Sequence, residues 1–145
     1  MSRLTNKIKQ GFSMKYILLL MTLTIGLFAE FKTIGLDEFE KLKKEGLPVI
    51  DIRTESEWKE TGIIEGSHKI TFFNERGQPL LADWFFEVGH LVTDKKTPFI
   101  IYCAHASRSK SLGKGLIQMG FENVYELDGG IENGWIKKGK KTIKE

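Results

Sequence analysis

The sequence predicts an α/β fold, an open and mostly parallel sheet of five strands with helices on both faces. Strand-like apolar runs alternate with amphipathic helical segments along the chain, which is the pattern of an open α/β sheet. The run Phe99–Tyr102 is apolar at every position, as is usual for a strand covered on both faces. With 145 residues, 41% hydrophobic and 28% charged, the chain has the size of one globular domain.

The first half of the chain supplies two strands and two helices of this alternation. Thr33–Ile34 is predicted as a short strand and Leu36–Glu45 as a helix, with acids in its first turn and lysines at its end. Those charges complement the helix dipole. Leu47–Ile52 is predicted as a buried strand, and Thr54–Glu60 as a short helix that ends before Gly62.

The middle of the chain is predicted as a strand, a turn and a helix. Ile70–Phe73 is the strand, and Asn74–Pro79 is the turn. The helix presents one apolar face and takes Asp83 as its N-cap. That face is formed by Trp84, Phe85, Val88, Leu91 and Val92.

The last third follows the strand Phe99–Tyr102. A helix is expected from Ser107 to Met119, with Met119 facing inward, and Gly120 ends it. Asn123–Leu127 is predicted as the fifth strand and Ile131–Lys138 as the final helix.

The first 29 residues have the order of a secretory signal peptide. Four basic residues and no acid precede an uncharged apolar run, which ends at Phe28 before Ala29. The run is shorter than the ~20 residues that a membrane-spanning helix needs. We expect residues 1–29 to be a signal peptide and residues 30–145 to be an exported, periplasmic domain that stays outside the membrane. An uncleaved leader that anchors the protein to the membrane is the alternative, and the chain starts at Met1 or Met14.

The net charge of +3 belongs to the leader. The chain has 22 basic and 19 acidic residues. Without the four basic residues of the leader, residues 30–145 hold 18 basic against 19 acidic side chains. A domain with this balance has no basic excess to bind phosphates, so no nucleic-acid partner is expected.

Cys103 is the only cysteine. A single cysteine excludes an intramolecular disulfide, a redox pair of cysteines and a cysteine-rich zinc site. The three histidines, His68, His90 and His105, are scattered without ligand spacing, so neither a metal nor another cofactor is expected.

The position of Cys103 indicates chemistry. It directly follows the strand Phe99–Tyr102 and precedes a helix by four residues, and such a turn directs backbone N–H groups and a helix N-terminus at one small volume. Arg108 and Lys110 place two cations in the first helical turn, where they are locally unfavourable. We interpret them as part of a site that attracts an anion. The alternative is that Cys103 is a small buried hydrophobic residue.

Several stretches of the chain share one family's motifs. Tyr102–Ser109 has a strand residue, Cys, four residues, Arg and Ser. Val49–Arg53 is followed by Glu57-Trp58, and Gly62–Ser67 comes next. In these residues, and over roughly residues 33–139, the chain resembles the rhodanese family. It departs from the family pattern at Ile63, where His is usual, and at Ala106, where Gly is frequent.

The resemblance implies a sulfurtransferase without a cofactor. Cys103 would attack the outer sulfur of a small anionic donor such as thiosulfate and become a persulfide. An acceptor would then remove that sulfur. This acceptor would be cyanide, a small thiol or a thiol of a partner protein. Asp51 and Arg53 occupy structural positions of the family, and Glu57 and Glu65 are predicted to be solvated. The residues assigned to substrate binding are Ala104, His105, Ala106, Ser107, Arg108, Ser109 and Lys110.

Two other functions remain open at this point. Cysteine-dependent phosphatases and arsenate reductases also set Cys and Arg around an anion loop, with five intervening residues, whereas this chain has four. The shorter loop forms a smaller cradle, which fits a sulfur better than a phosphate. A sulfur-relay or binding module, which delivers its persulfide to one dedicated partner without turnover, is the other alternative.

Overall fold

The computed structural model describes residues 29–144. Of the predicted leader, all but Ala29 lies outside the described residues. The sheet has five strands in the order β1-β5-β4-β2-β3, and all its strand pairs are parallel. The strands are β1 Glu30–Ile34, β2 Val49–Asp51, β3 His68–Lys69, β4 Phe99–Tyr102 and β5 Asn123–Leu127.

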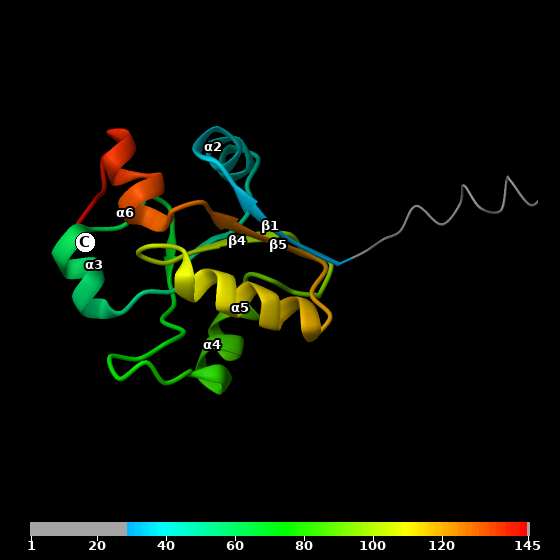
Figure 1. Ribbon diagram of the computed structural model, residues 1–145. Coiled ribbons are helices and arrows are strands. Elements are labelled where there is room, and N and C mark those ends of the chain that lie inside the picture. The colour runs from blue at the N-terminus through cyan, green and yellow to red at the C-terminus, as the bar shows by residue number, and fades with distance from the viewer. Residues whose placement is uncertain (1–28, 145) are drawn as a thin grey trace, which may run out of the picture.

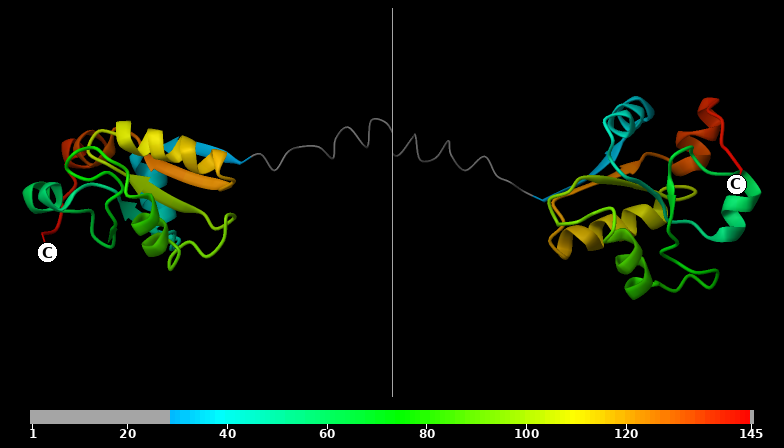
Figure 2. Two further views of the ribbon diagram at one scale, coloured as in Figure 1. Left: turned by 90° about the horizontal axis from the view of Figure 1, so that it is seen from below. Right: turned by 180° about the vertical axis from the view of Figure 1, so that it is seen from behind.

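Helices cover both faces of this sheet, which confirms the predicted fold class. In Figure 1, α2 and α6 lie on one side of the strands and α4 and α5 on the other. The two views of Figure 2 show the same layers from below and from behind. The helices are α2 Leu36–Lys44, α3 Glu55–Thr61, α4 Leu81–Val88, α5 Ser107–Gln118 and α6 Gly130–Gly134, with a 3₁₀ turn at Ile136–Lys138. No helix of the described part of the chain has the length and apolarity to cross a membrane.

Each face of the sheet has its own apolar core. Trp84 of α4 and Leu112 of α5 pack on one face, while Phe39 of α2 and Trp135 pack on the other. The alternating direction of side chains along the central strands supplies both cores. The β4 strand is therefore buried at every position.

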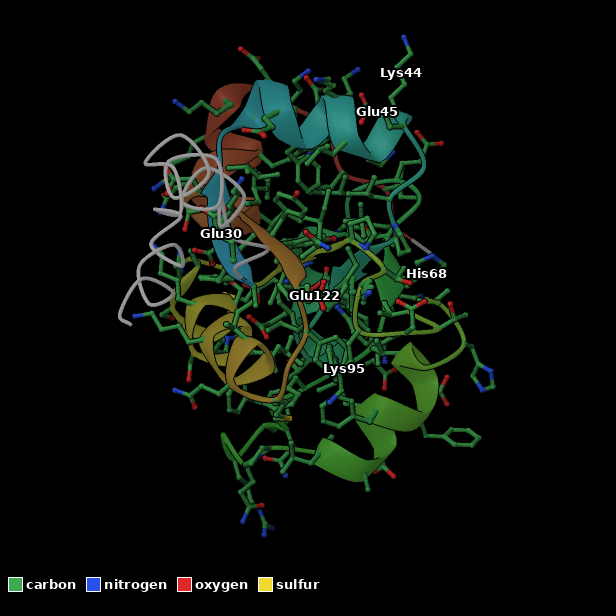
Figure 3. The ribbon with its side chains drawn as sticks, turned by 90° about the vertical axis from the view of Figure 1, so that its right-hand side faces the viewer. Glu30, Lys44, Glu45, His68, Lys95 and Glu122 are labelled. Carbon is green, nitrogen blue, oxygen red and sulfur yellow. The ribbon has the colours of Figure 1, made fainter. Side chains whose placement is uncertain are left out.

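The two ends of the strands differ in character. At the amino ends of the strands, Glu30 donates its N–H to the carbonyl of Glu122 at 2.9 Å, and Glu122 donates its N–H to the carbonyl of Lys95 at 2.8 Å (Figure 3). At the carboxyl ends, β2 and β4 end side by side, with Asp51 in register with Tyr102. Crevices for ligands form beyond the carboxyl ends of such strands.

The stretch from 63 to 80 departs from the prediction. Ile70–Phe73 is not a strand; the edge strand is β3, at His68–Lys69. Phe73 instead forms an isolated antiparallel bridge with Pro79. The Asn74 side chain holds the intervening turn, because its Oδ1 accepts the N–H groups of Arg76 and Gln78. Local turn bonds thus replace a longer strand.

The last three helices also differ from the prediction. The N-cap of α4 is Leu80, so Asp83 lies inside the first turn, and the helix ends at Val88, before Leu91. Met119 is 42% exposed, because α5 ends one residue earlier. The predicted helix Ile131–Lys138 is interrupted at Trp135. The buried Trp135 donates its indole N–H to the carbonyl of Lys141 at 2.9 Å, which turns the chain there.

Candidate active site

Cys103 lies at the end of β4, and its side chain is 0% exposed. The chain leaves the strand, reverses at Ala106 and enters α5 at Ser107. The Sγ atom lies 3.5 Å from the Oγ of Ser109, one helical turn further on. The loop therefore encloses the sulfur atom between the strand and the first turn of α5.

The reversal places Ala106 in the left-handed conformation, with φ of 70°. Among the described residues it is the only non-glycine residue with positive φ. This conformation costs an L-residue roughly 1–2 kcal/mol, and a glycine at this position would avoid that cost. Strain of this kind persists where the surrounding structure enforces it, as at functional sites.

The backbone N–H groups of the loop have no acceptor among the described residues. Among the hydrogen bonds of residues 29–144, none has the N–H of residues 104–109 as donor; the first N–H used is that of Lys110, which donates to the carbonyl of Ala106 at 2.9 Å. Successive N–H groups in a turn with left-handed residues form a concave site for an anion. The loop thus offers donors next to the sulfur of Cys103.

The carbonyl groups of the same loop are held by α6. Ile131 donates its N–H to the carbonyl of Cys103 at 2.9 Å, and Glu132 donates to that of Ala104 at 3.0 Å. This approach requires Gly130, where a Cβ atom would lie 2.5 Å from the carbonyl oxygen of Ala104. The bonds fix the carbonyl side of the loop, which leaves its N–H side for a ligand.

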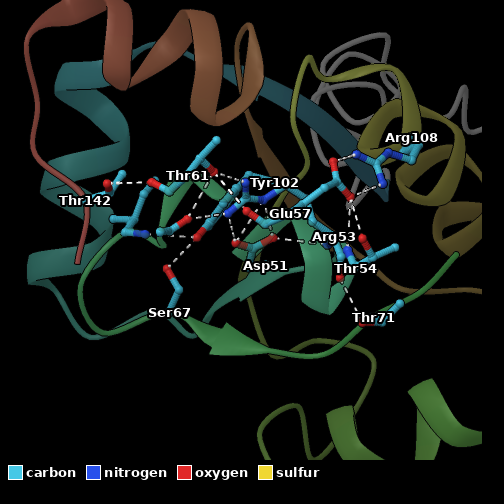
Figure 4. Close-up of polar contacts among 12 residues, drawn as sticks. Asp51, Arg53, Thr54, Glu57, Thr61, Ser67, Thr71, Tyr102, Arg108 and Thr142 are labelled. Atoms are coloured by element: carbon cyan, nitrogen blue, oxygen red, sulfur yellow. Dashed lines mark hydrogen bonds and ion pairs between the residues drawn. The ribbon is translucent and has the colours of Figure 1, made fainter. Parts of the chain in front are cut away.

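Arg108 of α5 forms an ion pair with Glu57 of α3. The two nitrogens Nη1 and Nη2 lie 2.9 and 2.5 Å from the carboxylate oxygens (Figure 4). The side chains are 28% and 26% exposed. Glu57 is further fixed by the N–H of Thr54, which donates to it at 3.0 Å and caps α3. The prediction that Glu57 is solvated is therefore wrong, because its partner comes from a helix distant in the sequence.

The electrostatics of this pair extend to the sulfur. Burial is the largest influence on Glu57 and opposes its charge, but the hydrogen bonds from Arg108 and Thr54 outweigh it and lower its pKa to about 2. The pKa of Arg108 is raised, first by its hydrogen bond to Glu57 and also by the Cys103 thiolate. Arg108 is therefore bound to the carboxylate of Glu57 and lies near enough to Cys103 for an electrostatic interaction.

A second carboxylate lies beneath the loop and was missed in the sequence. Glu126 of β5 is 0% exposed, and it accepts the hydroxyls of Ser109 and Thr33 at 2.7 Å each. Lys110 Nζ lies 3.7 Å from it. The available signal was its place two residues after Val124, on the same buried face of a central strand.

The remaining predicted residues fall into two groups. His105 and Ser107 are exposed and Ala104 is half-buried, so these three form the outer side of the loop. Asp51 and Arg53 form a buried ion pair of 2.7 Å. Arg53 also donates to Thr61 Oγ1 and to the carbonyl of Gly62, each at 2.7 Å. This pair joins β2 to the end of α3 rather than to Cys103.

A cleft of about 520 Å³ opens beside the loop. It lies between α3, the turn of residues 74–79 and the first turn of α5. Cys103 is not part of its wall, so Arg108 is the side chain that connects the cleft with the sulfur. The lining residues are Thr54, Glu57, Phe73, Asn74, Glu75, Gly77, Ser107, Arg108 and Ser111.

The arrangement defines a class of α/β protein that carries a cysteine in the loop at the carboxyl end of a central parallel strand. Within residues 29–144, no three His, Cys, Asp or Glu side chains gather to hold a metal ion. Comparison of the sequence with models of protein families gives a match of residues 35–138 to the Rhodanese-like domain. The chain belongs to that family.

Curated relatives agree with this assignment. The chain is 32% identical over 104 residues to the thiosulfate sulfurtransferase GlpE of Pseudomonas fluorescens, which covers 72% of this chain and 84% of the relative. It is 31% identical to GlpE of Pseudomonas aeruginosa, over 70% of this chain and 82% of the relative. These relatives support sulfurtransferase activity at the level of the family.

The fold itself is shared with more distant structures. The polysulfide-sulfur transferase homodimer of Wolinella succinogenes is 22% identical with a TM-score of 0.59, over 90% of this chain and 91% of that one. A thiosulfate sulfurtransferase of Pseudomonas aeruginosa is 23% identical with a TM-score of 0.60, over 77% of this chain and 20% of that one. At these identities the likeness concerns the fold.

Proposed function

We propose that this protein transfers sulfane sulfur through a persulfide on Cys103. The observation that carries the proposal is the set of unused N–H groups of residues 104–109, next to a cysteine at the end of a buried strand. Hydrogen bonds to a charged acceptor contribute about 1.5–3 kcal/mol each. Two or three of them stabilise a sulfur anion that burial would otherwise disfavour.

The reaction has two steps. The Cys103 thiolate attacks the outer sulfur of a donor such as thiosulfate, the S–S bond of the donor breaks, and sulfite leaves with the electron pair. The terminal sulfur of the new persulfide carries the negative charge, which the N–H groups of the loop hold. An acceptor such as cyanide or a thiol then attacks that sulfur, and the Cys103 thiolate is restored as the leaving group.

The side chains around the loop have separate roles in this scheme. Arg108 offsets the charge on the sulfur, with which it interacts electrostatically. Ser109 contacts the sulfur and is itself held by the buried Glu126. His105 and Lys110 are exposed and contribute to the field at the mouth of the loop.

The test is intact mass spectrometry of the purified protein after incubation with thiosulfate. The proposal expects a gain of one sulfur atom on the wild type and none on Cys103→Ser. Cyanide should then remove the added sulfur while thiocyanate accumulates with turnover. An adduct that cyanide discharges only slowly would favour a dedicated relay protein. If no sulfur donor of any kind loads the protein, the persulfide mechanism is wrong.

We also propose that residues 1–29 direct export. The basic start and the uncharged run before Ala29 support this. Fractionation of cells that express the full chain, followed by N-terminal sequencing, is the test. A periplasmic protein that begins near Glu30 is the expected result, a full-length membrane-bound protein indicates an uncleaved anchor, and a full-length cytoplasmic protein contradicts export.

A further inference from the structure

The two cations of the active-site loop already have carboxylate partners. Arg108 is held by both oxygens of Glu57, at 2.9 and 2.5 Å. Lys110 Nζ lies 3.7 Å from the buried Glu126. Each positive charge therefore faces a negative one on another element, α3 in the first case and β5 in the second.

The Glu57–Arg108 pair is a fixed part of the site. The carboxylate of Glu57 accepts the N–H of Thr54 at 3.0 Å, in addition to the guanidinium of Arg108. Its low pKa keeps it charged at any pH at which the protein works. Arg108 is therefore not an isolated cation that waits for an anionic substrate.

The adjoining cleft adds a further acid. Glu57 and Glu75 both line it, and Arg108 is the only cation among its lining residues. A thiosulfate dianion that approaches the Cys103 thiolate brings three negative charges together, and the lining of the cleft adds one net negative charge, because Arg108 offsets only one of the two acids Glu57 and Glu75. A singly charged donor lowers this repulsion, because Coulomb energy is proportional to the charge of the donor.

We infer that the sulfur donor of this protein is an organic sulfane-sulfur compound with at most one negative charge at its reacting end, and that Glu57 sets this preference over a dianion. The inference rests on the proposed persulfide function. It assigns to Glu57 a role in specificity, because the carboxylate neutralises the arginine that would otherwise favour thiosulfate.

The first step remains balanced with such donors. With a thiosulfonate, the Cys103 thiolate attacks the outer sulfur, the S–S bond breaks, and a sulfinate anion leaves. With a hydropersulfide, the outer sulfur is transferred in the same way, and its proton passes to the departing sulfur, which leaves as a thiol. In both cases the product on the protein is the Cys103 persulfide anion.

The test uses the full chain with two donors that share the same reacting bond but differ in charge. Thiosulfate is the dianion and benzenethiosulfonate is the monoanion, with cyanide as acceptor in both assays. The donors differ in intrinsic reactivity, so the measured quantity is the change in the ratio of their kcat/KM values between wild type and Glu57→Gln.

Glu57→Gln keeps a carbonyl that accepts the N–H of Thr54, but it leaves the charge of Arg108 uncompensated. We expect kcat/KM to rise about tenfold for thiosulfate and about threefold for benzenethiosulfonate, because the electrostatic energy doubles with the donor charge. The ratio then shifts about threefold toward thiosulfate. Glu60→Gln is the matched control, because Glu60 is exposed on the same helix and its substitution removes the same charge. This variant should leave the ratio of the kcat/KM values unchanged.

A salt titration of the wild type provides a second measurement that needs no variant. For thiosulfate, kcat/KM should stay level or rise between about 20 and 200 mM salt, because salt screens the repulsion. A steep fall would show an uncompensated cation and overturn the inference. An unchanged or lowered ratio in Glu57→Gln would also overturn it. A wild type that neither donor loads with sulfur would instead contradict the proposed function.

Discussion

The segments that follow β2 and β4 begin at the carboxyl ends of neighbouring parallel strands, but they differ in whether their polar groups are hydrogen-bonded. After β2, the buried Arg53 satisfies its guanidinium with Asp51, Thr61 and Gly62. After β4, the N–H groups of residues 104–109 in the loop at Cys103 have no acceptor in the described part of the chain. Asp51 and Tyr102, the last residues of the two strands, are neighbours in register.

The comparison separates a segment that stabilises the fold from a segment that forms the candidate active site. The first segment stabilises the fold, because all three nitrogens of the buried Arg53 guanidinium are hydrogen-bonded. In the described residues, the second segment retains N–H groups without acceptors and a strained residue, Ala106, which suit the anion binding that we propose for the loop. Glu57 connects the two, since it caps α3 after β2 and holds Arg108 after β4.

The largest expected effect is on stability, in the segment after β2. Arg53→Ala leaves the carboxylate of Asp51 buried without its partner, and breaking a buried pair in this way typically costs about 3–5 kcal/mol. Arg108→Ala, which breaks the more exposed pair, should cost about 1 kcal/mol or less. Urea unfolding of both variants measures the difference. Equal losses would show that the two pairs do not differ as proposed.

The second effect is on sulfur transfer, in the segment after β4. Arg108→Ala removes the guanidinium that offsets the charge on the sulfur, and loss of one such group at an active site typically lowers the rate by about 10²–10³. Arg108→Lys should retain part of the rate, because the charge remains. The rate of sulfur gain on Cys103, followed by intact mass, is the measurement. Rates within twofold of the wild type would exclude Arg108 from the chemistry.

Local pattern was sufficient to predict the centre of the sheet. Strands β4 and β5 have the predicted bounds, and α5 differs by one residue, because continuous apolar runs and helical spacing are local features of the sequence. The edge strand β3 has only two residues and both are exposed, so its existence depends on pairing with β2. No local signal distinguished it from the turn that follows.

The site was predictable in its centre and not in its partners. Cys103 and Arg108 were found because they lie five residues apart in one motif. The partner of Arg108, Glu57, is 51 positions away, and only the tertiary fold brings α3 within reach of an Arg108 side chain on α5. Glu126 reaches Ser109 from β5, and its depth depends on the strand order, which one sequence does not show.

A smaller effect on stability tests the strain in the loop. Ala106→Gly should raise the free energy of unfolding by about 0.5–1 kcal/mol, because Gly relieves the left-handed strain and loses part of that gain through the entropy of the unfolded chain. Ala104→Gly is the matched control, since Ala104 lacks a positive φ, and it should lower stability. If both variants are destabilised, the loop after β4 is not strained as described.

The smallest effect is on pH dependence, through the residue that connects the two segments. The pKa of Glu57 is lowered to about 2 in the folded protein, below its ordinary value near 4.3 in an unfolded chain. A group of this kind stabilises the fold above its unfolded pKa and loses that contribution as the pH falls toward its folded pKa. The loss should therefore occur between about pH 4.5 and 2. Because the pair is partly exposed, its size should be about 0.5 kcal/mol or less. Urea unfolding at pH 6 and at pH 3 should show a larger drop for the wild type than for Glu57→Gln. Equal drops would mean that the ion pair adds nothing to stability, and Glu57 would then affect only the charge at the active site.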